Sequence, residues 1–126
     1  MIVGIGLDII EVNRIRDVYQ RHKNRFIKRI LTEAEEAYVL RFKDPGERLA
    51  GRWAAKEAAF KALGTGLAEG MRWRDVEVVR APSGKPDLRF SGMALEHLRR
   101  LGATHHHLTI THGDNLAVAQ VILEKL

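Results

Sequence analysis

With 126 residues and a formal net charge of +5, the chain has the length of a single domain and a charge that favours an anionic partner. That partner could be nucleic acid, a membrane surface, an acidic protein or a phosphorylated ligand. The absence of cysteine excludes thiol catalysis and a disulfide framework and fits a reducing cytoplasm; with no leader-like N-terminus and no apolar run of about 20 residues, we expect neither a signal peptide nor a membrane span.

Helical patterns dominate the first half of the chain. Thr32 followed by Glu35 has the spacing of a capping box, and Asp44 before Pro45 marks a further helix that should stop at Gly64. Before these helices, apolar residues alternate with glycine up to an acid, which predicts a strand that ends there. The predicted elements are a strand over 1–8 and helices over 11–22, 24–31, 33–42 and 45–63.

Strand patterns dominate the second half. Gly102 closes a predicted helix, and the segment 113–115 has the residues of a hairpin turn. The predicted elements are strands over 74–79 and 87–90 joined by a turn over 81–86, a helix over 93–101, and strands over 107–111 and 116–123. This order predicts one α+β domain, residues 1–126, with a long central helix packed on a mostly antiparallel sheet.

The central segment GRWAAKEAAFKALGTG suggests a site. Glu57 and Lys61 lie four residues apart and so share a helix face, and the helix runs into Gly64, Thr65 and Gly66. A carboxylate, an ammonium and a turn that brings backbone N–H groups close to a ligand would suit a metal-bound phosphate. The alternative is an ordinary surface pair that stabilises the helix by about 0.2–0.5 kcal/mol.

Three further features have both a structural and a functional interpretation. Asp8 at a strand end would be either a helix N-cap or a metal ligand. Gly4 and Gly6 lack the third glycine of a dinucleotide fingerprint, so that interpretation is rejected. The ridge formed by Ala54, Ala58 and Ala62 should pack closely against another element.

Basic and histidine residues complete the candidates. If its helix is continuous, one stripe of cations is either a solvated face or a docking site for an acidic partner. His105 and His107 would share a strand face and could together bind zinc, with His112 as a third ligand. A contact with a phosphate, or a strand-end position without a ligand, is favoured over zinc. The stripe consists of Arg14, Arg21, Arg25 and Lys28.

Together these segments resemble one family. GIGLDIIEVNRI, RWAAKEAAFKALGTG, GKPDLRFSG and HLTITH…LAVAQVIL occur in this order and at similar spacing in bacterial holo-acyl-carrier-protein synthases, the small 4′-phosphopantetheinyl transferases. The resemblance runs from Met1 to Glu124, and Asp8 with Lys56 and Glu57 is the family's diagnostic set. The extra histidines before His107 depart from the family pattern.

The resemblance implies an activity. Such an enzyme moves phosphopantetheine from coenzyme A to a serine of an apo acyl carrier protein, releases adenosine 3′,5′-bisphosphate, and supports fatty acid biosynthesis in the cytoplasm. Asp8 and Glu57 would hold Mg²⁺, or Mn²⁺ in its place. Lys61 would stabilise charge on the pyrophosphate, and the general base would be Glu57 or a metal-bound water.

The resemblance also implies substrate contacts and an assembly. Arg14, Arg21 and Arg25 match the family's docking helix for the acidic carrier protein. The family is a homotrimer with shared sites, and the alanine ridge also indicates an oligomer. The implied coenzyme A contacts are Arg52 and His107 at the 3′-phosphate, Gly84, Lys85 and Pro86 on the adenine side, and Lys61 with Gly64, Thr65 and Gly66 along the phosphate and pantetheine arm.

Two other classes of function remain open from the residues alone. A small nucleic-acid-binding module would explain the basic charge, but it would not explain Asp8 and Glu57, and the chain lacks interleaved surface aromatics. A metal-dependent phosphohydrolase would use the same two carboxylates with water as the nucleophile.

Overall fold

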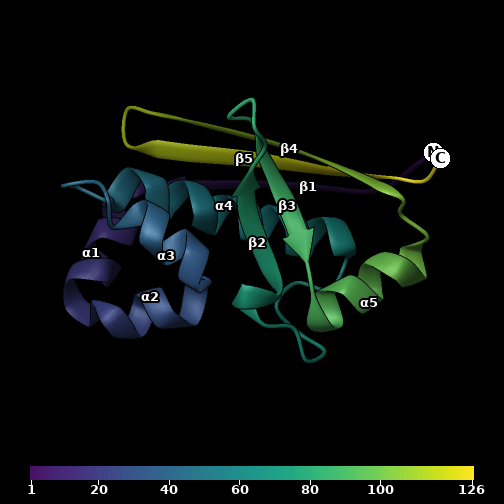
Figure 1. The fold of residues 1–126 in the computed structure, drawn as a ribbon, viewed down its shortest axis with the longest axis horizontal. Coiled ribbons are helices and arrows are strands. Elements are labelled where there is room, and N and C mark those ends of the chain that lie inside the picture. Colours follow the sequence, from purple (N-terminus) through teal and green to yellow (C-terminus); the bar gives the residue numbers. More distant parts are fainter.

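The computed structural model describes residues 1–126 and has an α+β fold (Figure 1). Its longest helix, α4, crosses the middle of the molecule, with the other helices gathered at its two ends. The strands are β1 (Ile2–Glu11), β2 (Val76–Arg80), β3 (Pro86–Phe90), β4 (His105–Gly113) and β5 (Leu116–Glu124). The helices are α1 (Val12–His22), α2 (Asn24–Ile30), α3 (Glu33–Val39), α4 (Gly46–Leu63), the 3₁₀ turn η1 (Trp73–Asp75) and α5 (Gly92–Leu101).

Both sheets are antiparallel. The larger has the order β1-β5-β4, and β2 pairs with β3 in a separate two-stranded sheet. The hairpin β4–β5 turns at Asp114 and Asn115, both with positive φ, the conformation that two-residue hairpin turns require. The two chain ends lie side by side (Figure 1), since the amide of Lys125 donates to the carbonyl of Met1. The predicted α+β class and the mostly antiparallel sheet are confirmed.

Close packing of β1 on α4 explains the two glycines of β1. A Cβ on Gly4 would lie 2.2 Å from the carbonyl oxygen of Ala62, and one on Gly6 would lie 1.8 Å from that of Ala58. Strand and helix can approach this closely because both sides lack bulk. The alanine ridge therefore does pack against another element, as expected, but that element belongs to the same chain. Its use as a sign of oligomerisation was wrong.

One local prediction was also wrong, and the condition attached to another is not met. Asp8 does not end its strand, because the ladder with β5 continues through the pair Glu11–Leu116. The basic stripe depended on one continuous helix, and this condition is not met, because Lys23 has a φ of 43° and separates α1 from α2 at the boundary predicted between residues 22 and 24. Helix propensity alone does not reveal such a break, since lysine is a good helix former. By contrast, the capping box of Thr32 and Glu35 and the end of α4 at a left-handed Gly64 are confirmed.

The side of the large sheet away from α4 carries uncovered apolar side chains. Ile5, Leu7 and Ile9 of β1 are 60%, 56% and 59% exposed, while the alternating residues face the helix. Val118 and Ile122 of β5 lie beside them in the register. None of the helices combines the length and apolar character needed to cross a membrane.

Candidate active site

Two carboxylates converge beside α4. Asp8 of β1 and Glu57 of α4 line one pocket of about 360 Å³, together with Arg14. Oδ1 of Asp8 accepts a hydrogen bond from Lys61 Nζ at 3.1 Å, and the same ammonium donates to the carbonyl of Leu7 at 3.0 Å. Oδ2 of Asp8 is buried and has no hydrogen-bond partner. A buried acceptor without a donor is costly, so this oxygen is suited to a ligand.

Glu57 is destabilised in its charged form. Burial raises the pKa of Glu57, the nearby charge of Asp8 raises it further, and Lys61 opposes the shift. Glu57 and Lys61 are not the surface pair that the alternative interpretation described, because Lys61 pairs with Asp8 instead.

The donor set fits Mg²⁺. No cluster of three or more histidine or acidic side chains suited to a metal is present, but Mg²⁺ commonly takes one or two protein carboxylates and completes its shell with water and substrate phosphates. The partnerless Oδ2 of Asp8 and the raised pKa of Glu57 both indicate that a cation would stabilise this pair of charges.

A second polar pocket, of about 160 Å³, surrounds Arg52. The Arg52 side chain is buried, its Nε has no hydrogen-bond partner, and its guanidinium lies 4.4 Å from the centre of the Tyr38 ring. Burial lowers the pKa of Arg52, so this cation is poorly solvated and would gain from an anion. Arg48 and Arg80 line the same pocket and add to its positive charge.

The expected adenine-side residues lie next to this basic pocket. Pro86 lines it and also a smaller neighbouring pocket of about 90 Å³ that contains Lys85 and His107. Gly84 has a φ of 88° in the preceding turn, a conformation that favours glycine. The structure therefore brings Arg52, Pro86, Lys85 and His107 into one region.

The carboxylate pocket and the basic pocket lie on different sides of α4. They share no lining residue. Arg52 and Glu57 are five positions apart, which at about 100° per residue separates them by about 140° around the helix axis. One chain therefore does not bring these two groups of predicted site residues together.

The glycine turn after α4 differs from its expected role. The amides of Gly64, Thr65 and Gly66 donate to the carbonyls of Lys61 and Phe60 at 3.0, 3.4 and 3.3 Å, as in a typical helix C-cap. The expectation of backbone N–H groups presented to a ligand was therefore wrong. What the turn needs from Gly64 and Gly66 is positive φ, at 81° and 58°.

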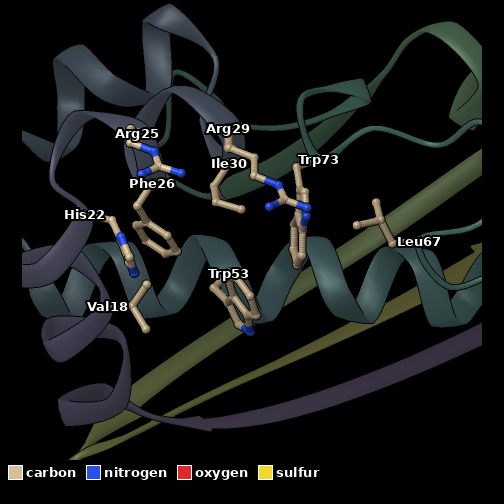
Figure 2. Close-up of a pocket in the computed structure, with 9 residues that line it drawn as sticks. All are labelled: Val18, His22, Arg25, Phe26, Arg29, Ile30, Trp53, Leu67 and Trp73. Atoms are coloured by element: carbon tan, nitrogen blue, oxygen red, sulfur yellow. The ribbon is translucent and has the colours of Figure 1, made fainter.

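The basic residues of α1 and α2 divide into separate environments. Arg14 lines the carboxylate pocket, Arg21 is exposed on α1, and Lys28 is paired with Glu36 at 2.8 Å. Arg25 lies at an apolar pocket of about 430 Å³. In Figure 2 the aromatic rings of Phe26, Trp53 and Trp73 form its wall, with arginines beside them.

Three of the four histidines of β4 each face a different carboxylate, while Nδ1 of His105 lies 3.0 Å from Oγ1 of Thr104. His106 contacts Asp87 at 3.1 Å and His107 contacts Glu124 at 3.0 Å, while His112 contacts Glu47. They do not gather around a common centre.

Comparisons with known proteins agree on one family. A model of the 4′-phosphopantetheinyl transferase superfamily matches residues 4–121. A holo-[acyl-carrier-protein] synthase of Solibacter usitatus (strain Ellin6076) is 48% identical over 124 residues, which cover 98% of this chain and 99% of that protein. The chain belongs to the 4′-phosphopantetheinyl transferase superfamily.

Solved structures support the same assignment. The holo-[acyl-carrier-protein] synthase from Neisseria meningitidis is similar with a TM-score of 0.90 and 32% identity, covering 99% of this chain and 100% of that one. A holo-(acyl-carrier-protein) synthase from Bacillus anthracis str. Ames, solved in complex with CoA (3′,5′-ADP), has a TM-score of 0.83 and 42% identity, with 100% and 99% covered. The family resemblance drawn from the sequence is confirmed, as is the prediction of a transferase fold.

Two features around α4 were missed by the sequence analysis: the arginines near Arg52, and the burial of Lys56. Arg48, one turn before Arg52 on α4, and Arg80 on β2 were not singled out, because arginine is common on surfaces. Lys56 was noted only as part of a motif, although it is 0% exposed and bonded to Glu35. Lys56 shares a helix face with the apolar residues Leu49, Phe60 and Leu63, and this was the available signal that it is buried with a partner.

Proposed function

We propose that the chain transfers 4′-phosphopantetheine from coenzyme A to a serine of an apo acyl carrier protein and releases adenosine 3′,5′-bisphosphate. The observation that carries this proposal is the pocket lined by both Asp8 and Glu57, in which Lys61 pairs with Asp8. The relatives of the chain are named holo-[acyl-carrier-protein] synthase. Residues 1–126 act as one transferase domain, and the reaction supplies fatty acid biosynthesis in the cytoplasm.

Asp8 and Glu57 would hold Mg²⁺, or Mn²⁺ in its place, which when bound supplies Lewis-acid neutralisation of pyrophosphate charge. Lys61 is within reach of the same pyrophosphate and stabilises the charge that develops on the leaving group. Glu57 is the chain's own candidate for the general base, since its pKa is raised towards the range useful for proton transfer.

The nucleotide of coenzyme A belongs to the other region. Arg52 and His107 bind the 3′-phosphate, and Gly84, Lys85 and Pro86 lie along the adenine. The segment Gly64–Gly66 borders the pantetheine arm through the side chain of Thr65 and the backbone carbonyls. Because the carboxylates and these groups lie on different sides of α4, a coenzyme A molecule that contacts both sets would bridge two subunits.

A homotrimer provides this arrangement. The uncovered side chains of Ile5, Leu7 and Ile9 form an apolar surface of the kind that marks protein interfaces. A closed ring uses a heterologous contact, so each subunit presents one region to a neighbour and a different region to the next. Each site of the trimer then contains the carboxylates of one chain and Arg52 of another.

Mass spectrometry tests the activity. Incubation with coenzyme A, Mg²⁺ and an apo carrier should add one phosphopantetheinyl group to the carrier serine. Release of phosphate or of free phosphopantetheine without carrier modification would favour a phosphohydrolase. Salt-sensitive binding to oligonucleotides without either reaction would favour a nucleic-acid module.

Complementation tests the shared site. Glu57→Gln and Arg52→Ala should each be nearly inactive alone, but their co-expressed mixture should recover about a quarter of wild-type activity, because some interfaces then combine both intact halves. Sedimentation should show a trimer. An active monomer, or a mixture as inactive as its components, would contradict the shared site.

A further inference from the structure

A buried ion pair joins α4 to α3 at Lys56, the residue before Glu57 of the candidate site. Lys56 is 0% and Glu35 2% exposed, and Nζ of Lys56 donates to Oε1 of Glu35 at 2.7 Å. The ammonium also donates to the carbonyls of Trp73 at 3.2 Å and Val76 at 2.6 Å. All three of its protons therefore have an acceptor.

Glu35 is equally well satisfied. Its Oε1 accepts from the amide of Thr32 at 2.9 Å, and its Oε2 accepts from the amide of Val78 at 2.9 Å. The pair therefore ties the start of α3 and the first residues of β2 to the middle of α4. The two carbonyls bound by Lys56 flank η1, so this short turn is held at both ends.

The turn η1 carries Trp73 into the apolar pocket of Figure 2. The Trp73 ring stacks on Trp53, with centroids 4.4 Å apart and an angle of 30° between the planes. Trp53 in turn stacks on Phe26 at 6.0 Å. Both Trp53 and Phe26 also line the pocket that contains Asp8 and Glu57, so the apolar wall is continuous with the carboxylate pocket.

A buried ion pair contributes little net stability compared with apolar side chains of the same volume. What distinguishes the pair is its geometry. The Lys56 ammonium donates in three fixed directions and so holds the carbonyls of Trp73 and Val76 in place. An apolar residue at position 56 would fill the same space but would not hold the Trp73 carbonyl.

We propose that Lys56 and Glu35 are positioning residues that set the stack of Trp73 on Trp53 and thereby the shape of the wall beside the catalytic pocket. The kinetic part of this inference rests on the proposed function. The carrier serine must reach the carboxylates past this wall, near Arg25, whereas the pocket around Arg52 shares no lining residue with the apolar pocket. A loosened wall should therefore weaken use of the carrier and leave coenzyme A binding unchanged.

The two tryptophans are the only ones in the chain, so their stack gives a direct readout. Stacked indoles couple and produce a circular-dichroism couplet in the far ultraviolet, which Trp53→Phe should remove and so identify. Lys56→Met should lose most of this couplet and raise the KM for carrier about tenfold, with a much smaller change in kcat. Binding of coenzyme A, measured by calorimetry, should stay at the wild-type affinity.

Leu98→Ala is the matched control, because it destabilises the core through α5 without contacting the pair. It should keep both the couplet and the KM at comparable loss of stability. If Lys56→Met does not fold, Glu35→Gln replaces it. The new glutamine has the size of the glutamate, and its amide oxygen can still accept from the Val78 N–H. Part of the couplet should be lost.

An unchanged couplet in the folded variants, or an equal loss in Leu98→Ala, would overturn the inference. The couplet needs no substrate. If wild-type protein shows no transferase activity while Lys56→Met still loses the couplet, the proposed function fails and the positioning of Trp73 stands.

Discussion

Lys56 and Glu57 are neighbours in sequence, but the fold stabilises the charge of Lys56 and destabilises that of Glu57. Lys56 is fully buried, and each of its protons has an acceptor. Glu57 is half-buried beside Asp8, whose Oδ2 has no partner, and its pKa is raised. A buried charge that is fully bonded within the chain serves the fold, whereas charges without partners in the chain mark a candidate ligand site. The two residues therefore separate a structural side of α4 from a functional one.

The sharpest test of the functional side removes its carboxylates. Asp8→Asn and Glu57→Gln should each lower the transfer rate by about 10²-fold or more, a loss typical of removing one electrostatic contact to a transition state. Both variants should keep the wild-type circular-dichroism spectrum, because neither carboxylate anchors the core. Near-normal turnover of either one at saturating Mg²⁺ would remove it from the ligand assignment.

Substitutions of the buried pair on the structural side should change the free energy of unfolding. Lys56→Met leaves Glu35 charged, buried and without its cation, and we expect a loss of about 3–5 kcal/mol in the free energy of unfolding. The double variant Lys56→Met, Glu35→Leu should lose clearly less, since no uncompensated charge remains. Urea titrations of both variants measure this difference. Equal losses in the single and double variants would mean that the pair is not coupled.

Exposed cations form a third situation, in which charge is neither buried nor bonded. Arg21→Glu combined with Arg25→Glu should raise the KM for carrier about tenfold and leave coenzyme A affinity unchanged, with the wild-type KM rising as salt screens the contact. Arg99→Glu on α5 is the control and should have no effect. Arg14 is better left out, because it lines the carboxylate pocket and its reversal would also affect coenzyme A. An equal loss of coenzyme A affinity in the double variant would move these arginines into the nucleotide site.

The sequence was sufficient for much of the fold because its signals are local. The capping box at Thr32, the glycine that ends α4 and the hairpin turn at Asp114 depend on neighbouring residues, and all were predictable. The continuation of β1 past Asp8 was not, since it depends on where β5 lies. Long-range pairing also decides which residue bonds Lys56.

The sequence named the residues of the candidate site but did not give their geometry. Asp8, Glu57 and Lys61 converge because β1 packs tightly on α4, which Gly4 and Gly6 permit. Helix geometry places Arg52 on another side of the same helix from Glu57. The structure adds that the pockets on these two sides share no lining residue. Contacts between subunits leave no local pattern in one chain.

The smallest expected effect concerns stability at Glu57. Because burial and Asp8 raise its pKa, the folded chain holds a proton on Glu57 more tightly than the unfolded chain does. Stability should therefore fall as the pH rises from the ordinary glutamate pKa through the raised one, and the penalty stays above that window. Glu57→Gln removes the penalty, so without substrate or metal it should melt slightly higher than wild type at pH 7 and equally near pH 4. Asp17→Asn, an exposed carboxylate on α1, should show no such pH-dependent gain. A Glu57→Gln variant that melts lower than wild type at pH 7 would show that Glu57 stabilises the fold, and the separation of the two sides of α4 would then fail at its central residue.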